Sequence, residues 1–353
     1  MNKWNIQQIV PSELTQAEWQ AIHELAVTLR KESYPDDPPP TLGEVTQSWS
    51  IHPPVAEERA WVIWDATASP NVPRVIGYNR TTIIHMEENA HIAQVYLGVH
   101  PAARRQGLGR QLLAHSAAFA CETGRRLMII ESNSNCPAGG AFLQAAGATQ
   151  GLSMDVVQLD LQQVDLSLLH SWIERAAERA SGFEIGFWDG PYPEEALVQV
   201  GKVKAAMNEQ PTQDLDIEDF QWTPEVLRQL DENMVQRQIT RWTFYARESN
   251  TGNLAGFTEI FWSPGNQIVG QQGDTGVLNE CKNKGLGRWL KAAMLEKVLA
   301  DRPETRYIRT GNATTNEPMR KINQELGFKL FRSAWIWQLP VDLKSEDTAG
   351  TTG

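Results

Sequence analysis

The chain has 353 residues, about twice the length of an ordinary domain, and this predicts two domains rather than one large core. Its 32 lysine and arginine residues against 43 aspartate and glutamate residues give a net charge of −11, which argues against general binding to nucleic acid or to an anionic membrane. A hydrophobic content of 41% with 21% charged residues is typical of a packed globular protein and argues against a disordered or fibrous chain.

The sequence also lacks the usual signals of membranes, disulfides and metals. No segment approaches roughly 18 consecutive apolar residues, and the first residues lack the apolar core of a signal peptide, so we expect a cytoplasmic protein. Three distant cysteines, Cys121, Cys136 and Cys281, form no C-x-x-C pattern and are expected to be reduced. The seven histidines show no metal-binding spacing, so no metal is expected.

The elements of the first half follow from alternating apolar runs, helical periodicities and polar turns. We predict, in chain order, a helix at residues 13–31, strands at 59–66 and 74–84 joined by a turn at Ser69-Pro70-Asn71, a strand at 93–99, a helix after residue 107, a strand at 126–132, a short helix that ends near Gly147, and a last strand at 154–161.

The second half repeats this order. We predict a helix at residues 194–207, strands at 241–248 and 253–262 joined by a turn at 250–253, a short strand at 276–278, a helix after residue 285, a strand at 305–310, and a helix capped by Asn316 that ends at Gly327. This predicts an α/β protein of two tandem domains, each a mixed sheet flanked by helices. We place the domains at residues 1–165 and 166–343 and expect residues 344–353 to be a disordered tail.

An internal repeat supports the tandem organisation. Residues 96–113, YLGVHPAARRQGLGRQLL, align without a gap to residues 274–291, DTGVLNECKNKGLGRWLK, at an offset of 178. Seven positions are identical, including three glycines in register. Each copy predicts a strand, a basic glycine-rich loop and a helix.

The glycine-rich loop predicts an anion site. Two glycines directly before a helix let backbone N–H groups converge on a phosphate while the helix N-terminus adds a favourable dipole. Nearby basic residues would strengthen the site, namely Arg104, Arg105 and Arg110 in the first copy and Lys282, Lys284 and Arg288 in the second. The pattern is neither a P-loop, since no G-K-[ST] follows, nor a dinucleotide fingerprint, since Leu112 and Leu290 stand where the third glycine would be.

The loop resembles the acetyl-CoA signature of the GNAT superfamily of N-acetyltransferases, R/Q-x-x-G-x-G/A, in a tandem arrangement of two GNAT-like domains. The resemblance implies a mostly antiparallel sheet in each domain, acetyl-CoA or another acyl-CoA as cosubstrate, pantetheine bound by strand backbone and pyrophosphate bound by loop amides. The cofactor-binding residues that it implies, with the basic neighbours, are Leu97, Gly98, Val99, Arg104, Arg105, Gln106, Gly107, Leu108, Gly109 and Arg110 in the first copy, and Thr275, Gly276, Val277, Lys282, Lys284, Gly285, Leu286, Gly287 and Arg288 in the second.

A second stretch carries the resemblance further. Residues 310–328, TGNATTNEPMRKINQELGF, are similar to the T-x-N-x-x-x-N-x-x-M-x-x-I-N-x-x-L-G-F stretch of tandem GNAT proteins, which implies that Asn312, Asn316 and Asn323 line the acyl-CoA site. The sequence departs from the family in one respect: neither final helix contains the tyrosine that serves many GNAT enzymes as general acid.

Transfer of an acyl group to an amine requires a neutral amine, so a carboxylate near the thioester is expected. Glu259, a charge inside the apolar strand GFTEIFW, is the first candidate, and Glu131, at the end of RLMIIES, is the candidate of the first copy. Tyr96 is a candidate acid. Arg80 stands in the first copy where Glu259 stands in the second, so the two copies cannot use the same base.

These observations predict an N-acetyltransferase that acetylates the primary amine of a small molecule by direct attack in a ternary complex, acting as a monomer or homodimer. A noncatalytic acyl-CoA sensor, or one catalytic domain beside a degenerate scaffold domain, are the alternatives. The acceptor stays open among aminoglycosides, polyamines, amino acids, peptide amines and mycothiol precursors, although the acidic surplus favours a cationic one.

Overall fold

The computed structural model describes residues 3–69 and 71–341, which form two compact units. Unit 1 comprises residues 3–153, 213–218 and 334–341, and unit 2 comprises residues 154–212 and 219–333. Pro70 in the first predicted turn and the predicted tail at 344–353 lie outside the described residues. No helix within the described residues is long and apolar enough to cross a membrane.

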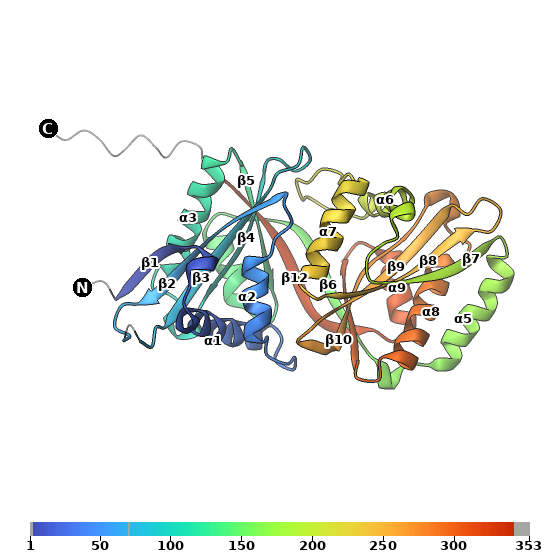
Figure 1. The fold of residues 1–353 in the computed structure, drawn as a ribbon, viewed down its shortest axis with the longest axis horizontal. Helices are drawn as coiled ribbons and strands as arrows, with labels where there is room; N and C mark the ends of the chain where they lie inside the picture. Colours follow the sequence, from blue (N-terminus) through green and yellow to red (C-terminus); the bar gives the residue numbers. More distant parts are fainter. Residues whose placement is uncertain (1–2, 70, 342–353) are drawn as a thin grey trace. The chain divides into compact units, whose positions relative to one another are not determined.

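Unit 1 contains a sheet in the order β1-β2-β3-β4-β5-β12, in which β4 and β5 are parallel and the other neighbours are antiparallel (Figure 1). Its strands are β1 (Trp4–Ile9), β2 (Ala56–Asp65), β3 (Val75–Ile84), β4 (Ile92–Val99), β5 (Leu127–Asn133) and the last part of β12 (Lys329–Pro340). The mixed, mostly antiparallel sheet expected from the sequence is therefore confirmed in this unit.

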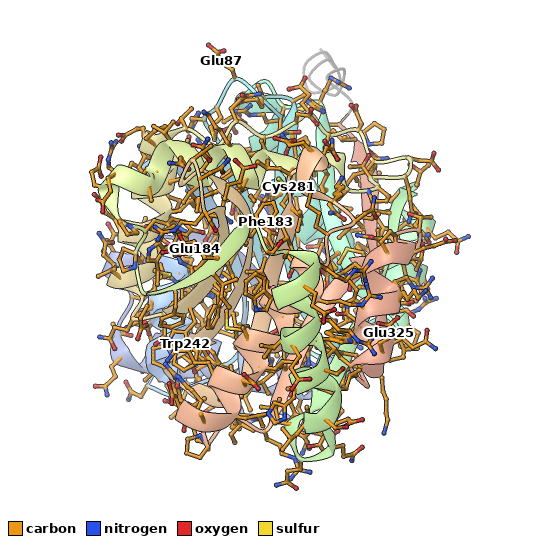
Figure 2. All side chains as sticks on the ribbon, turned by 90° about the vertical axis from the view of Figure 1, so that its right-hand side faces the viewer. Glu87, Phe183, Glu184, Trp242, Cys281 and Glu325 are labelled. Carbon is orange, nitrogen blue, oxygen red and sulfur yellow. The ribbon has the colours of Figure 1, made fainter. Side chains whose placement is uncertain are left out.

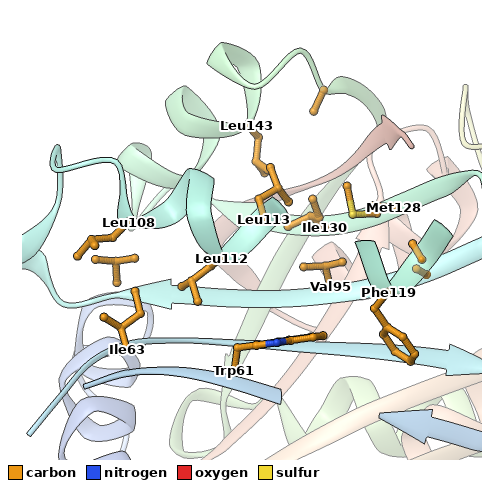
Figure 3. Close-up of a cluster of buried hydrophobic side chains, with 14 of the residues drawn as sticks. Trp61, Ile63, Val95, Leu108, Leu112, Leu113, Phe119, Met128, Ile130 and Leu143 are labelled. Atoms are coloured by element: carbon orange, nitrogen blue, oxygen red, sulfur yellow. The ribbon is translucent and has the colours of Figure 1, made fainter. Parts of the chain in front are cut away.

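The sheet of unit 1 has an apolar core on each face, because side chains alternate along its strands. On β2, Trp61 and Ile63 join the core of α3 (Leu108–Glu122) and α4 (Pro137–Ala145), part of which is shown in Figure 3. Ala60 and Val62, on the opposite face, join the core of α1 (Gln16–Ser33) and α2 (Leu42–Ser50). Thr15 and Thr41 begin these two helices with complete capping boxes.

Unit 2 contains the equivalent sheet in the order β6-β11-β10-β9-β8-β7, with β10 and β11 as its parallel pair. Its strands are the last part of β6 (Thr149–Asp160), β7 (Phe183–Asp189), β8 (Thr240–Glu248), β9 (Leu254–Ser263), β10 (Asn266–Val277) and β11 (Tyr307–Ala313). The same architecture in the two units confirms the two-domain α/β prediction.

Helices again flank both faces of the sheet in unit 2. One core, which includes Trp242 and Trp262, involves α5 (Leu166–Arg179) and α8 (Leu286–Asp301), while another involves α6 (Leu197–Ala205) and α7 (Pro224–Gln236). The last helix, α9 (Glu317–Glu325), is capped by Asn316, as expected. Phe183 of β7 and Trp242 of β8 lie on this sheet (Figure 2).

Each unit takes one strand from beyond the sequence boundary expected at residue 165. Residues 154–160 of β6 pair with β11 in unit 2, although they precede that boundary. Residues 334–340 of β12 pair with β5 in unit 1, although they come from the end of the chain. The contiguous domain limits remain a prediction about the sequence, whereas the compact units exchange their final strands.

Candidate functional site

The glycine-rich loop of unit 1 leads into α3 without a side-chain cap. Arg105 and Gly107 both have left-handed backbone, with φ of 65° and 81°, and Gly107 is the N-cap of α3. No side chain of the described residues accepts a hydrogen bond from the first turn of α3 at this cap, so its backbone N–H groups are open to a ligand. Successive N–H groups in such a turn form an anion-binding concavity.

The loop of unit 2 repeats this conformation. Asn283 and Gly285 take φ values of 65° and 87°, and Gly285 begins α8, again with no side-chain cap in the described structure. The repeat seen in the sequence therefore extends to the backbone. Leu108 and Leu286, the first residue of each helix, are buried in the cores, so each contributes only its backbone N–H to a ligand.

Beside each loop two parallel strands diverge. In unit 1 the pairing of β4 with β5 runs from Ile92↔Leu127 to Val95↔Ile130, while β4 continues through Leu97 and Gly98 to Val99. In unit 2 the pairing of β10 with β11 runs from residues 269↔307 to 271↔309, and β10 continues through Thr275 and Gly276 to Val277. Those predicted cofactor-binding strand residues thus lie in the diverging ends, where backbone groups can accept another extended chain.

Packing favours glycine in these diverging strands. A Cβ on Gly98 would lie 2.4 Å from Leu29 Cδ1 of α1, and one on Gly276 would lie 3.0 Å from Phe257 Cε1. A Cβ on Gly109, in the first turn of α3, would lie 3.1 Å from Phe142 Cε2 of α4, whereas one on Gly287 would lie 3.8 Å from Ile322 Cδ1. Gly98, Gly276 and Gly109 thus allow a close approach of neighbouring side chains, whereas a side chain at position 287 would make an ordinary contact.

The first basic residue of each loop pairs with an acidic residue of an earlier helical segment. Arg104 donates to both carboxylate oxygens of Glu32 at 2.7 and 2.5 Å, and these hydrogen bonds lower the pKa of Glu32. Lys282 donates to Glu209 at 2.9 Å in the same way. Arg104 and Lys282 therefore fix the loops, and a phosphate would compete with a carboxylate for them.

The remaining loop cations differ between the units. Arg288 pairs with Glu325 at 3.0 Å and Lys284 lies 4.9 Å from the ring centre of Phe183. In the described part of unit 1, no ion pair involves Arg105 or Arg110, which flank the open amides together with Gln106. Unit 1 thus keeps two cations for a phosphate, and the amides and dipole of the helix start complete the site.

A buried charged network lies on the face of the unit 2 sheet that α6 and α7 cover. Glu259 on β9 is 1% exposed; Lys204 donates to it at 2.9 Å, Thr243 at 3.3 Å, and the Tyr192 hydroxyl also donates to it. Burial alone would raise the pKa of Glu259, but the charges of Lys204 and Arg241 outweigh it, and the pKa is lowered. Glu259 is therefore an ionised, enclosed carboxylate.

This network forms the floor of a cavity of about 300 Å³ in unit 2. Asp274 extends the network to the cavity surface, since its carboxylate lies 3.4 Å from Lys204 Nζ and its side chain is 36% exposed. Gly273 and Asp274 lie in a bulge, because β10 shifts register against β9 between Gln272↔Ile260 and Thr275↔Thr258. The bulge re-aims Asp274 where β10 separates from β11.

Unit 1 has a different arrangement at the corresponding place. Arg80 donates to both oxygens of Glu58, at 2.7 and 3.0 Å, and to the carbonyl of Ser48 at 2.5 Å. The register of β3 with β4 is continuous from Gly77↔Val99 to Ile83↔Ala93. The charge at this position is reversed relative to Glu259, and the bulge of unit 2 has no counterpart in this pairing.

Tyr96 and Glu131 lie at the point where β4 and β5 separate, each one residue beyond the last parallel pair. Partial desolvation and the Glu131 charge raise the pKa of the Tyr96 phenol, so it keeps its proton at neutral pH. The structure therefore brings these two predicted catalytic residues to one opening in unit 1, and Glu259 to the equivalent region of unit 2.

The three asparagines of unit 2 fall into two groups. Asn323 is buried: it accepts from Lys291 Nζ at 2.8 Å and donates to Asn312 Oδ1 at 2.7 Å. Asn312 lies on the diverging end of β11, so Asn323 can influence a ligand only through Asn312. Asn316 caps α9 and donates its amide to Gln210.

Comparisons with known proteins relate this geometry to a family. Residues 56–147 match the model of the acetyltransferase (GNAT) domain. A tandem GNAT protein from the clavulanic acid biosynthesis pathway, solved without AcCoA, is 25% identical and covers 99% of this chain and 100% of its own, with a TM-score of 0.76. The chain therefore contains a GNAT acetyltransferase domain at residues 56–147 and shares the fold of a tandem GNAT protein along its length.

Two further solved structures share this fold. A GCN5-related N-acetyltransferase from Sphaerobacter thermophilus has 14% identity, covers 97% of this chain and 96% of its own, and has a TM-score of 0.65. A glucosamine N-acetyltransferase region of a fungal multi-domain β-N-acetylglucosaminidase has 13% identity, covers 95% of this chain and 38% of its own, and has a TM-score of 0.63. None of the curated proteins compared with the chain matches it significantly.

The polar residues around Glu259 were not predicted as a site, although one of them had a visible signal. Leu197, Val200 and Lys204 share one helical face, so the spacing places a lysine among apolar residues on α6. Tyr192, Arg241 and Asp231 had no such signal, because they meet only through the fold. No group of histidine, cysteine, aspartate and glutamate side chains in the described residues is arranged to hold a metal ion.

Proposed function

We propose that this protein is an acyl-CoA-dependent N-acetyltransferase that transfers an acetyl group from acetyl-CoA to the primary amine of a small molecule. The observation that carries the proposal is the pair of uncapped, left-handed loops at the starts of α3 and α8, each beside diverging parallel strands. Backbone amides suit the pyrophosphate of CoA, and free strand edges suit the amides of its pantetheine arm.

Acetyl-CoA supplies an acyl group activated as a thioester. Transfer forms a C–N bond between the amine and the acyl carbon, breaks the C–S bond, and leaves CoA as a thiol after it receives a proton. A free amine with a pKa of about 10.4 is almost entirely protonated at pH 7, so its deprotonation costs roughly 4–5 kcal/mol. The protein must therefore hold the ammonium beside a carboxylate that accepts its proton or positions a water that does.

We assign catalysis to unit 2, because its cavity reaches the bulge at which β10 leaves β11. Asp274 is the carboxylate open to this cavity, while Glu259 is enclosed and holds Lys204 and Tyr192 in place. In unit 1 the Arg80–Glu58 pair occupies the position of Glu259, which favours a unit that binds acyl-CoA without turnover. Tyr96 and Glu131 are the residues on which any transfer in unit 1 would depend.

Calorimetry with acetyl-CoA and a steady-state assay of thioester loss with a panel of primary amines test the proposal together. We expect micromolar binding and amine-dependent release of CoA. Tight binding with no release of thiol for any amine would instead support the noncatalytic sensor.

The division between the units is tested by placing a carboxylate in each loop. Gly285→Glu should reduce acetyl transfer by at least a hundredfold, because it would place negative charge and backbone strain in the glycine-rich loop next to the catalytic cavity. Gly107→Glu should leave transfer within about threefold of the wild type while it removes one binding event in calorimetry. Equal partial losses of activity in the two variants would contradict this division.

A further inference from the structure

The cavity in unit 2 has charged groups at its floor and apolar side chains along its walls. The walls are formed by residues of α7, the segment after it and β9, with a tryptophan from the segment before α7, and they are Leu227, Leu230, Met234, Ile239, Phe261 and Trp222. A volume of about 300 Å³ is at the small end of the range for ligand sites, which fits a compact molecule and not a nucleotide or an oligosaccharide.

Both cations among the described cavity-lining residues are already neutralised. Arg241 Nη1 lies 2.7 Å from Asp231 Oδ1, and Lys204 Nζ lies 2.9 Å from Glu259 Oε2. Their side chains are also buried, at 6% and 8% exposure. A carboxylate on a ligand would therefore find no cation to pair with.

The acidic residues are not neutralised in the same way. Asp231, Glu259 and Asp274 outnumber the two cations, so the lining carries one net negative charge. Asp274 is the exposed member of this group, at 36% against 9% for Asp231 and 1% for Glu259. The negative charge is thus accessible at one place, which suits a single ammonium group.

From these contacts we infer that the acceptor is a small, apolar primary monoamine without a carboxylate, of the aralkylamine class, held with its ammonium at Asp274 and its apolar body between Leu230, Ile239 and Phe261. Polyamines and aminoglycosides need several open carboxylates, and amino acids would bring their own carboxylate against Asp274. This inference rests on the proposed function and names the substrate class of the same cavity.

The test compares phenethylamine with L-phenylalanine, which differ by the carboxylate, and with spermidine. For the wild type we expect kcat/KM to be at least fiftyfold higher for phenethylamine than for either other amine. Asp274→Asn should raise the KM for phenethylamine at least tenfold while calorimetric binding of acetyl-CoA stays within twofold. Equal or better use of L-phenylalanine or spermidine would overturn the inference.

A cation placed at the cavity wall provides a second, independent reading. Leu230 is 39% exposed on α7 and lines the cavity. Leu230→Arg should lower the ratio of kcat/KM for phenethylamine to kcat/KM for L-phenylalanine at least fivefold, because the arginine supplies a partner for the carboxylate. Val235→Arg is the matched control, since it is 55% exposed on the same helix but does not line the cavity, and it should leave the ratio within twofold. An equal effect of both variants would also overturn the inference.

Binding measurements separate failure of this inference from failure of the proposed function. The two aromatic amines are titrated by calorimetry into protein saturated with CoA. Binding of phenethylamine without binding of L-phenylalanine supports the inference, even if no acetyl transfer occurs. Absence of transfer alone counts against the proposed N-acetyltransferase activity. Failure of phenethylamine to bind overturns the inference whatever the activity.

Discussion

Lys291 illustrates how one residue can set both a stability profile and the orientation of a site. It lies on α8 with 2% of its surface exposed, and burial lowers its pKa from 10.5 to about 7. Its ammonium only donates hydrogen bonds, so Asn323 must turn its oxygen toward Lys291 and its amide N–H toward Asn312. Asn312 then accepts through its oxygen, which leaves its own amide donors for the diverging end of β11.

The same burial predicts how stability depends on pH. Between pH 7 and about 10.5 the unfolded chain binds a proton that folded Lys291 releases, so the free energy of unfolding rises with pH in this window. A change in pKa from 10.5 to about 7 corresponds to roughly 4–5 kcal/mol of destabilisation below pH 7. Against this, loss of the hydrogen bond would leave the buried Asn323 oxygen unsatisfied at a cost of about 1–3 kcal/mol.

Lys291→Met should therefore change the sign of its effect with pH. We expect the variant to be more stable than the wild type by about 1–3 kcal/mol at pH 6 and less stable by a similar amount at pH 10, as measured by urea unfolding of the unit 2 transition. Lys321→Met, an exposed lysine of α9, is the control and should change stability by less than about 0.5 kcal/mol at either pH. A Lys291→Met effect of the same size and sign at both pH values would contradict the assignment.

At the scale of elements, the loop-to-helix junctions carry the proposed CoA site. Gly107 and Gly285 take φ of 81° and 87°, and an L residue there is strained by about 1–2 kcal/mol. Gly124 and Gly252 take φ of 71° and 72°, and no atom lies within 4 Å of the position that a Cβ would occupy on either. They provide controls in which the strain lies away from the loops.

Alanine at the two loop glycines should separate binding from stability. Gly107→Ala and Gly285→Ala should each weaken acetyl-CoA binding at their own site at least tenfold in calorimetry, because the αL turn aims the amides at the pyrophosphate. Gly124→Ala and Gly252→Ala should lower the melting temperature by a similar amount and bind acetyl-CoA as the wild type does. Wild-type affinity for acetyl-CoA in both loop variants would exclude the glycine-rich loops as its binding sites.

The elements also show how far the sequence alone can lead. The repeat identified both loops, the glycines before each helix and the strand before each loop, since those features depend on local backbone chemistry; the left-handed conformation of Gly107 and Gly285 came from the structure. The sequence patterns did not predict α2, α5, α7, β1 or β7, because the apolar patterns of these elements are short or interrupted by charged residues. Of the charged network around Glu259, only Lys204 had a sequence signal, because Tyr192, Lys204 and Arg241 come from three separate segments and meet only in the fold.

At the scale of the whole molecule, each compact unit includes a strand from outside its own half of the sequence, so a division at residue 165 does not separate the units. Residues 334–340 supply the strand that pairs with β5 in unit 1, and Trp337 donates from Nε1 to Ser132 Oγ at 2.8 Å. Val341, which follows, is part of the buried core of α3 and α4. A fragment that ends at residue 165 would lack this strand and would expose one edge and part of its core.

A chain cut after residue 165 should therefore yield halves that depend on one another. Co-expressed fragments 1–165 and 166–353 should copurify, whereas either fragment alone should aggregate or lack a cooperative thermal transition by circular dichroism. Joining residues 334–341 to fragment 1–165 through a flexible linker should restore such a transition, because the missing strand and core residues are then supplied in the same chain. Fragment 1–165 that melts cooperatively without this addition would show that the exchanged strand is dispensable, and the contiguous division would then describe the folding unit.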